Sequence, residues 1–143
     1  MVNKMLVKEI MTKNVVTIEA NNTVFDACKK YHDYKVGCLV VEDNGFCVGI
    51  VTERDIIERT ICVKKDPQKT KVSEIMSAGI KTVYALDSVD KAIEIMKQYK
   101  FKKLPVISNN DIVGIITVTD ISNAKSEMTK RFMETWVKTK WQD

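Results

Sequence analysis

Two segments of this chain share the pattern Gly-x-x-Thr-x-x-Asp, at Gly49–Asp55 and at Gly114–Asp120. A carboxylate that is held at the start of a helix can accept hydrogen bonds from both vicinal hydroxyls of a ribose, the charge-assisted geometry used for the sugars of nucleotides. The same spacing also fits a capping box, in which the threonine and the acid satisfy backbone N–H groups of the helix. A capping box accepts Glu or Gln equally well, whereas both segments carry the shorter acid. The pattern therefore favours ribose binding.

The two motifs are part of a longer internal repeat with an offset of 65 residues. Aligning residues 7–57 with residues 72–122 without a gap gives 19 identities in 51 positions. An ungapped match of this extent indicates two copies of one structural unit. We therefore divide the chain into a first repeat, a basic linker, a second repeat and a C-terminal helical extension, at residues 1–60, 61–71, 72–122 and 123–143.

Each repeat is predicted to have the element order β-α-β-β-α. A short strand precedes a helix, whose apolar residues follow the i, i+3, i+4, i+7 spacing from Val24 onward. Asn22 or Thr23 can cap this helix, and Asp87 or Ser88 can cap its counterpart in the second repeat.

Turn residues at 43–45 and at 108–110 join the next two strands of each repeat, and a last helix begins at Glu53 and near Val118. A unit of about 60 residues buries little core by itself. We therefore expect an α/β (α+β) fold in which two repeats pack sheet to sheet with pseudo-twofold symmetry. Ligands would bind in the clefts between them.

The C-terminal extension is predicted to form an amphipathic helix that continues from Asp120 and packs on its own domain or on a dimer partner. Its apolar stripe comprises Ile121, Ala124, Met128, Phe132 and Trp136.

The doubled pattern resembles a tandem pair of CBS domains, the regulatory module also called a Bateman module. The resemblance rests on the segments IMT and VVTI, on VGCLVV and FKKLPVI, and on the two terminal motifs, and it covers about residues 5–123. Members of that family commonly bind AMP, ADP, ATP or S-adenosylmethionine between the repeats and pair into disc-like dimers. The resemblance therefore implies a non-catalytic, homodimeric sensor of an adenine nucleotide, which signals to an effector protein that the sequence does not identify.

In such pairs each pocket takes residues from both repeats, so the resemblance implies two composite ligand sites. In one, Thr117, Thr119 and Asp120 contact ribose and phosphate, and the base is enclosed by Thr12, Val15, Val16, Val36 and Gly37. In the other, Thr52, Arg54 and Asp55 act together with Ser77, Ile80, Lys81, Phe101 and Lys102.

The two implied sites differ in charge. Arg54 and Lys102 give the Asp55 site cationic groups for a phosphate, whereas Gly37 stands at the position that matches Lys102. We predict that the Asp55 site prefers phosphorylated nucleotides. A solvated strand end is the alternative interpretation of Lys102.

Catalysis needs a nucleophile with a positioned base, a metal site, or a paired acid and base. The chain has a single histidine, His32, and the four cysteines contain no CxxC pair. We therefore expect neither an enzyme nor a metal site.

The net charge of +4 lies outside the two repeats. Residues 1–57 carry seven basic and eight acidic side chains and residues 72–122 carry six of each, whereas residues 58–71 carry five basic and two acidic ones. A DNA-binding protein more typically has a strongly basic face along one element. The basic stretch is thus interpreted as a solvated linker, with an anion or nucleic-acid contact as the alternative.

No apolar run approaches the roughly 20 residues that span a bilayer, and the N-terminus lacks the features of a signal peptide. We expect a cytoplasmic protein without membrane contact. Three alternatives stay open: a regulator that binds S-adenosylmethionine, a nucleic-acid-binding protein with a nucleotide as effector, and a ligand-free interaction scaffold.

Overall fold

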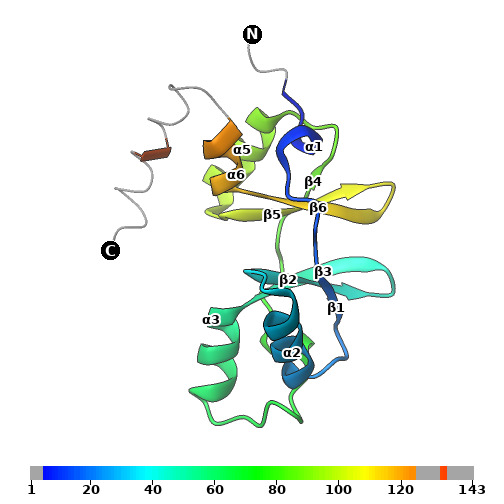
Figure 1. Cartoon of the computed structure of the whole chain (residues 1–143), viewed down its shortest axis with the longest axis vertical. Coiled ribbons are helices and arrows are strands. Elements are labelled where there is room, and N and C mark those ends of the chain that lie inside the picture. The colour runs from blue at the N-terminus through cyan, green and yellow to red at the C-terminus, as the bar shows by residue number, and fades with distance from the viewer. Residues whose placement is uncertain (1–4, 125–132, 135–143) are drawn as a thin grey trace. The chain divides into compact units, whose positions relative to one another are not determined.

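A computed structural model of the chain describes residues 5–124 and 133–134. It has a mixed α/β fold with two three-stranded sheets and covering helices, which confirms the predicted class (Figure 1). The described residues form two compact units. The Asp120 unit lies within Met1–Lys13, Lys81–Ser108 and Val113–Asp143, and the Asp55 unit within Asn14–Ile80 and Asn109–Ile112.

The Asp55 unit contains one sheet with the strand order β1-β2-β3. Strand β1 pairs parallel with β2, and β2 pairs antiparallel with β3, with a bulge between Val41 and Glu42. Helices α2 and α3 lie on the same side of the β2–β3 hairpin (Figure 1). The elements are β1 Thr17–Glu19, α2 Val24–Tyr34, β2 Cys38–Asp43, β3 Phe46–Thr52, α3 Glu53–Ile56, the π-helix η1 Ile57–Ile61 and α4 Val72–Ile75.

The Asp120 unit repeats this arrangement with the strand order β4-β5-β6. Strand β4 pairs parallel with β5, with Val83 opposite Val106. The elements are α1 Val7–Ile10, β4 Val83–Tyr84, α5 Val89–Tyr99, β5 Lys103–Ser108, β6 Asp111–Thr117 and α6 Val118–Ala124.

Helices α2 and α5 begin at the predicted caps. Thr23 caps α2, since its hydroxyl accepts a hydrogen bond from Asp26 N at 3.1 Å, and Ser88 caps α5 in the same way. Both helices end at a lysine in the left-handed region, Lys35 with φ 55° and Lys100 with φ 62°. Of the alternatives left open by the sequence, Thr23 and Ser88 are therefore the caps.

The two hairpins turn at the predicted residues. Asn44 and Gly45 join β2 to β3 with φ angles of 53° and 83°, and Asn109 and Asn110 join β5 to β6 with 52° and 69°. Positive φ at both central residues is the geometry of a type I′ turn, which matches the twist of the strands it connects. Asn and Gly adopt this region more readily than other residues.

Each core is completed by the short helix that begins the other repeat in the sequence. Val7 of α1 is buried among second-repeat residues, and Val72 and Ile75 of α4 are buried among first-repeat residues. The backbone bonds are equivalent: Val7 N donates to Asp87 O, and Val72 N donates to Asn22 O, both at 2.8 Å. Each compact unit therefore contains the first helix of the other sequence repeat.

The basic stretch before α4 is exposed at its lysines but anchored by two buried threonines. Thr60 and Thr70 are 0% and 5% exposed, and Thr70 O accepts a hydrogen bond from Val24 N at 2.8 Å. Arg59, which precedes the linker at residues 61–71, belongs to η1.

The predicted C-terminal helix is described only in part. Helix α6 runs to Ala124, with Ile121 buried and Ala124 exposed, and Met133 is buried as well. Met128, Phe132 and Trp136 of the predicted stripe lie outside the described residues. Among residues 5–124 and 133–134, no helix is long and apolar enough to cross a membrane.

Candidate functional site

The Asp55 motif stands where β3 ends and α3 begins. Asp55 N donates to Thr52 Oγ1 at 3.2 Å, and Thr52 N donates to Asp55 Oδ2 at 2.9 Å, so the motif forms a capping box. Asp55 is only 9% exposed. The capping function that the spacing allowed is therefore present, and it uses one carboxylate oxygen, Oδ2.

The Asp120 motif has the same box at the start of α6. Thr117 N donates to Asp120 Oδ2 at 3.0 Å, and Asp120 N donates to Thr117 Oγ1 at 3.1 Å. The hydroxyl of Thr12 adds a bifurcated bond to Oδ1 and Oδ2 at 3.1 and 3.2 Å. Three of the residues that the resemblance grouped thus lie together in one compact unit.

Each motif pairs with a backbone segment that directly follows a short helix, α1 for the Asp120 motif and α4 for the Asp55 motif. We call these the crossing segments. Thr12 pairs with Ile115 through bonds of 2.9 and 3.0 Å, and Ser77 pairs with Ile50 through bonds of 2.9 and 3.2 Å. Thr12 and Ser77 are therefore each bonded to a residue that lies two positions before the motif threonine and five positions before the motif aspartate.

The glycine of each motif makes room for this crossing. A Cβ on Gly114 would lie 2.9 Å from Thr12 O, and one on Gly49 would lie 2.9 Å from Ser77 O. A real Cβ is not found that close to a backbone oxygen. No sequence signal indicated this role, because the crossing segment is remote along the chain.

The two arginines near Asp55 differ in their partners. Arg54 Nε pairs with Glu58 Oε2 at 2.7 Å, and its side chain is 82% exposed. This Glu58 carboxylate raises the pKa of Arg54. Arg59 Nε instead lies 3.9 Å from Asp55 Oδ1. Sequence reasoning selected Arg54 and missed Arg59, although the i, i+4 spacing from Asp55 was a usable signal.

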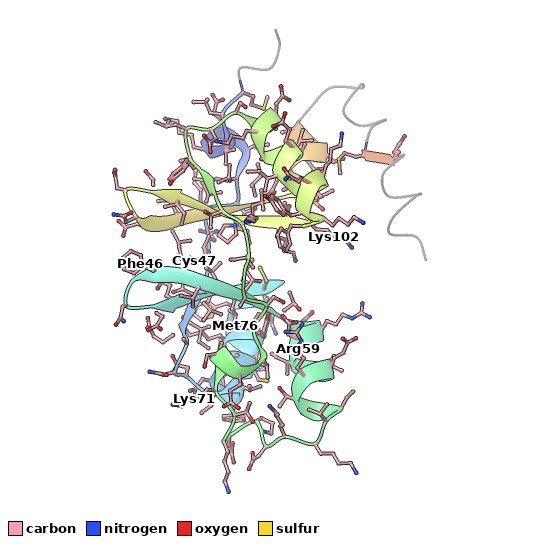
Figure 2. The ribbon with its side chains drawn as sticks, turned by 180° about the vertical axis from the view of Figure 1, so that it is seen from behind. Phe46, Cys47, Arg59, Lys71, Met76 and Lys102 are labelled. Atoms are coloured by element: carbon pink, nitrogen blue, oxygen red, sulfur yellow. The ribbon has the colours of Figure 1, made fainter. Side chains whose placement is uncertain are left out.

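Arg59 also contacts the last residue of α4 and the segment that follows it. Its Nη1 donates to the backbone oxygens of Ile75 and Met76 at 3.3 and 3.2 Å. Figure 2 labels Arg59 and Met76 on neighbouring segments of the Asp55 unit. Arg59 therefore joins the motif helix to the crossing segment that carries Ser77.

Tyr31 supports the Asp55 motif from α2. Its hydroxyl donates to the backbone oxygen of Val51, the residue before the motif threonine. Burial raises the pKa of Tyr31, so the hydroxyl stays protonated and remains a donor. The equivalent position of the second repeat holds Met96, which offers no such bond.

Lys81 and Phe101 of the predicted set meet around Tyr99 in the Asp120 unit. Lys81 Nζ lies 4.5 Å from the centre of the Tyr99 ring, and the rings of Tyr99 and Phe101 are stacked with centres 6.4 Å apart. A cation over an aromatic face is an attractive arrangement. Tyr99 was not among the predicted site residues.

The other predicted residues are divided between the two units. Lys102 and Thr119 belong to the Asp120 unit, and Val15, Val16, Val36, Gly37 and Ile80 belong to the Asp55 unit. Their roles toward a ligand stay predictions. Within residues 5–124 and 133–134, the side chains of His, Cys, Asp and Glu form no group of three or more that could hold a metal ion.

Comparison with known proteins gives consistent matches. The CBS domain family matches residues 7–61 and 72–127. The CBS domain-containing protein YhcV of Bacillus subtilis is 34% identical over 116 residues, which cover 81% of this chain and 82% of that protein. A conserved CBS domain protein of unknown function from Thermoplasma acidophilum, TA0289, has a TM-score of 0.77 at 30% identity over 95% of this chain and 78% of its own.

A third similar protein is an oligomer. A hexameric CBS-CP12 protein from bloom-forming cyanobacteria has a TM-score of 0.74 at 29% identity, with coverage of 96% of this chain and 90% of its own.

Proposed function

Since this chain belongs to the CBS domain family, we propose that it is a non-catalytic regulatory module that binds an adenine nucleotide, AMP, ADP or ATP, through Asp55 and Asp120. The observation that carries the proposal is the fixed orientation of both motif carboxylates. In each, a backbone N–H holds Oδ2 at 2.9 or 3.0 Å. A side chain that is already fixed loses little conformational entropy when it binds.

The Asp55 carboxylate retains the capacity to accept a ribose diol. Its Oδ2 takes one bond from Thr52 N, and Arg59 Nε at 3.9 Å is beyond hydrogen-bond distance of Oδ1. An ionised carboxylate offers about four lone-pair positions. Two hydroxyl donors can therefore bind without displacing the capping bond.

The Asp120 carboxylate has a polar neighbour that a ligand would share. The Thr12 hydroxyl divides one proton between Oδ1 and Oδ2 at 3.1 and 3.2 Å, distances longer than the roughly 2.5–2.7 Å of a strong O–H to carboxylate bond. A bound ribose can replace this divided bond with two direct ones. Thr12 would then be free to bond another part of the ligand.

We propose that this chain forms dimers and that the dimer passes the signal to a partner protein. A hexameric relative supports assembly as a property of this fold. Light scattering after gel filtration, with and without AMP, measures the oligomeric state of this chain.

Isothermal titration calorimetry tests nucleotide binding directly. AMP, ADP, ATP and S-adenosylmethionine are titrated into the unaltered chain, Asp55→Asn and Asp120→Asn. Asn keeps the shape and one acceptor oxygen but removes the charge, so we expect two sites in the parent and one in each variant. Asp111→Asn, at the exposed start of β6, is the matched control and keeps both sites.

A thermal-shift assay supplies an independent measurement. A ligand at 100 times its dissociation constant stabilises a fold by about 2.7 kcal/mol. If none of the three nucleotides raises the melting temperature, or if both Asn variants keep two sites, the proposal is wrong. Binding of S-adenosylmethionine alone would replace the nucleotide by a different adenosine ligand at the same carboxylates.

A further inference from the structure

Arg59 lies beside the Asp55 carboxylate without neutralising it through a hydrogen bond. It is one helical turn after Asp55, in η1, and the Nε to Oδ1 distance is 3.9 Å. Nη1 of the same guanidinium donates to the backbone oxygens of Ile75 and Met76. These carbonyls stand at the end of α4, where helix carbonyls lack intrahelical partners. The guanidinium is therefore held in place beside the motif by neutral groups.

The held guanidinium has donors to spare. Its five N–H groups include two on Nη1, and the other three belong to Nε and Nη2. The Arg59 side chain is 53% exposed. A guanidinium offers adjacent N–H groups in a planar fork that fits two oxygens of a phosphate. The group can thus accept an anion while keeping its bonds to the crossing segment.

Arg54, the arginine within the motif, is placed differently. Its Nε is paired with Glu58 at 2.7 Å, and both side chains are mostly exposed. An anion would have to compete with Glu58 for this cation. Among the described residues, the carboxylate paired with Arg59 is that of Asp55, and its Oδ1 is 3.9 Å away, beyond hydrogen-bond distance.

The second repeat has no equivalent cation in its sequence at this position. The offset of 65 residues places Ala124 opposite Arg59 and Thr119 opposite Arg54. Both positions lie in the helix that starts with the Asp120 capping box. The two carboxylate sites therefore share the capping box, but one helical turn after the aspartate the first has the cationic Arg59 and the second has the uncharged Ala124.

We propose that Arg59 is the specificity-determining residue of the Asp55 site and selects a phosphorylated nucleotide over the corresponding nucleoside. The proposal rests on the proposed function, because it assumes a ribose on Asp55. It assigns the phosphate contact to a residue outside the motif. It also predicts that the Asp120 site binds nucleoside and nucleotide with similar affinity.

The test uses the full chain carrying Asp120→Asn, so that only the Asp55 site is titrated. AMP and adenosine are titrated by calorimetry into this parent and into parents that also carry Arg59→Gln, Arg59→Lys or Arg54→Gln. We expect Arg59→Gln to weaken AMP binding by about 10- to 100-fold, as a lost charged hydrogen bond does, and to leave adenosine within about twofold. Arg59→Lys keeps the charge without the fork and should give an intermediate loss. Arg54→Gln tests the motif arginine as the competing phosphate contact, and because its guanidinium is paired with Glu58 we expect a smaller loss of AMP affinity than in Arg59→Gln.

Each other outcome counts against the proposal. Equal losses for AMP and adenosine in Arg59→Gln would mean that Arg59 only holds the fold. An AMP-specific loss in Arg54→Gln that equals or exceeds the loss in Arg59→Gln would move the phosphate contact to the motif arginine. Retained AMP affinity in Arg59→Gln, with binding abolished by Asp55→Asn, would refute the role of Arg59 and leave the proposed function standing. If the Asp120→Asn parent binds neither AMP nor adenosine, both the role of Arg59 and the proposed function are overturned.

Discussion

Replacing Gly114 by alanine should destabilise the protein although the backbone at this residue is compatible with alanine. The added Cβ would lie 2.5 Å from Met11 Sδ and 2.9 Å from the backbone oxygen of Thr12. The thioether of Met11 is flexible and can rotate away. The Thr12 oxygen belongs to backbone that is bonded to Ile115 twice, at 2.9 and 3.0 Å, so it moves only if that pairing weakens.

The magnitude follows from two opposing effects. Alanine restricts the unfolded chain, which stabilises the folded state by about 0.4–1 kcal/mol where no strain arises. Forcing an extra methyl into a filled site costs about 1–3 kcal/mol, and this cost includes the weakening of the two hydrogen bonds to Ile115. The free energy of unfolding should therefore fall by about 1–2 kcal/mol. For a chain of this length this lowers the melting temperature by roughly 3–6 °C.

Urea unfolding followed by circular dichroism measures the change, and Gly45→Asn is the matched control. Gly45 has φ +83° with no other atom within 4 Å of where a Cβ would stand, and its counterpart Asn110 adopts φ 69°. Asn at Gly45 meets no neighbouring atom and differs from Gly only in its cost at positive φ, which Asn bears better than other residues, so its loss of stability should be smaller than that of Gly114→Ala. A Gly114→Ala protein as stable as the parent, or more stable, would refute the steric role of the motif glycine.

Two further substitutions test contacts seen in the structure. Thr12→Val removes the hydroxyl that bonds Asp120, and because Thr12 is exposed we expect a loss of only about 0.5–1 kcal/mol by urea unfolding. In α2, hydrogen bonds from the backbone of Thr23 and then from the Asn22 side chain hold the pKa of Asp26 below its ordinary value. The stabilisation by Asp26 is therefore complete above the unfolded pKa of about 3.9, and is lost as pH falls through the lower folded pKa. Asp26→Asn should be less stable than the parent at neutral pH and should lose less stability when the pH is lowered through that window.

Controls for these two variants use the same positions. Thr12→Ser keeps the hydroxyl and should match the parent, so an equal loss in Thr12→Ser and Thr12→Val would assign the effect to packing. Asp26→Glu keeps a titrating carboxyl. If Asp26→Asn and the parent lose the same stability in acid, the capping bond does not set the pH dependence.

Local features were predictable because they depend on neighbouring residues. The caps at Thr23 and Ser88 and the two-residue turns form from side chains and φ preferences within a few positions. The motif boxes are local as well, since Thr52 and Asp55 are three residues apart. These are the elements for which prediction and structure agree.

The arrangement around the motifs was less predictable because it joins distant segments. Arg59 contacts carbonyls 16 and 17 residues later in the chain, at Ile75 and Met76. The motif pattern favoured Arg54, which is nearer to Asp55 in sequence but turned to Glu58. Helix geometry explains the difference, because residues four apart share a face and adjacent residues do not.

By itself the sequence determined that the chain is a doubled unit with one carboxylate motif in each copy. Identity at 19 of 51 positions and two intact motifs need no structure to be recognised. Only the tertiary structure decided that α1 and α4 complete the cores of the opposite repeats, and that the motif glycines and Arg59 meet those crossing segments. The physical reason is that a repeat specifies its own elements through local propensity and pattern. Whether α1 or α4 fills a given core depends instead on the path of the chain between distant segments, which only the tertiary structure shows.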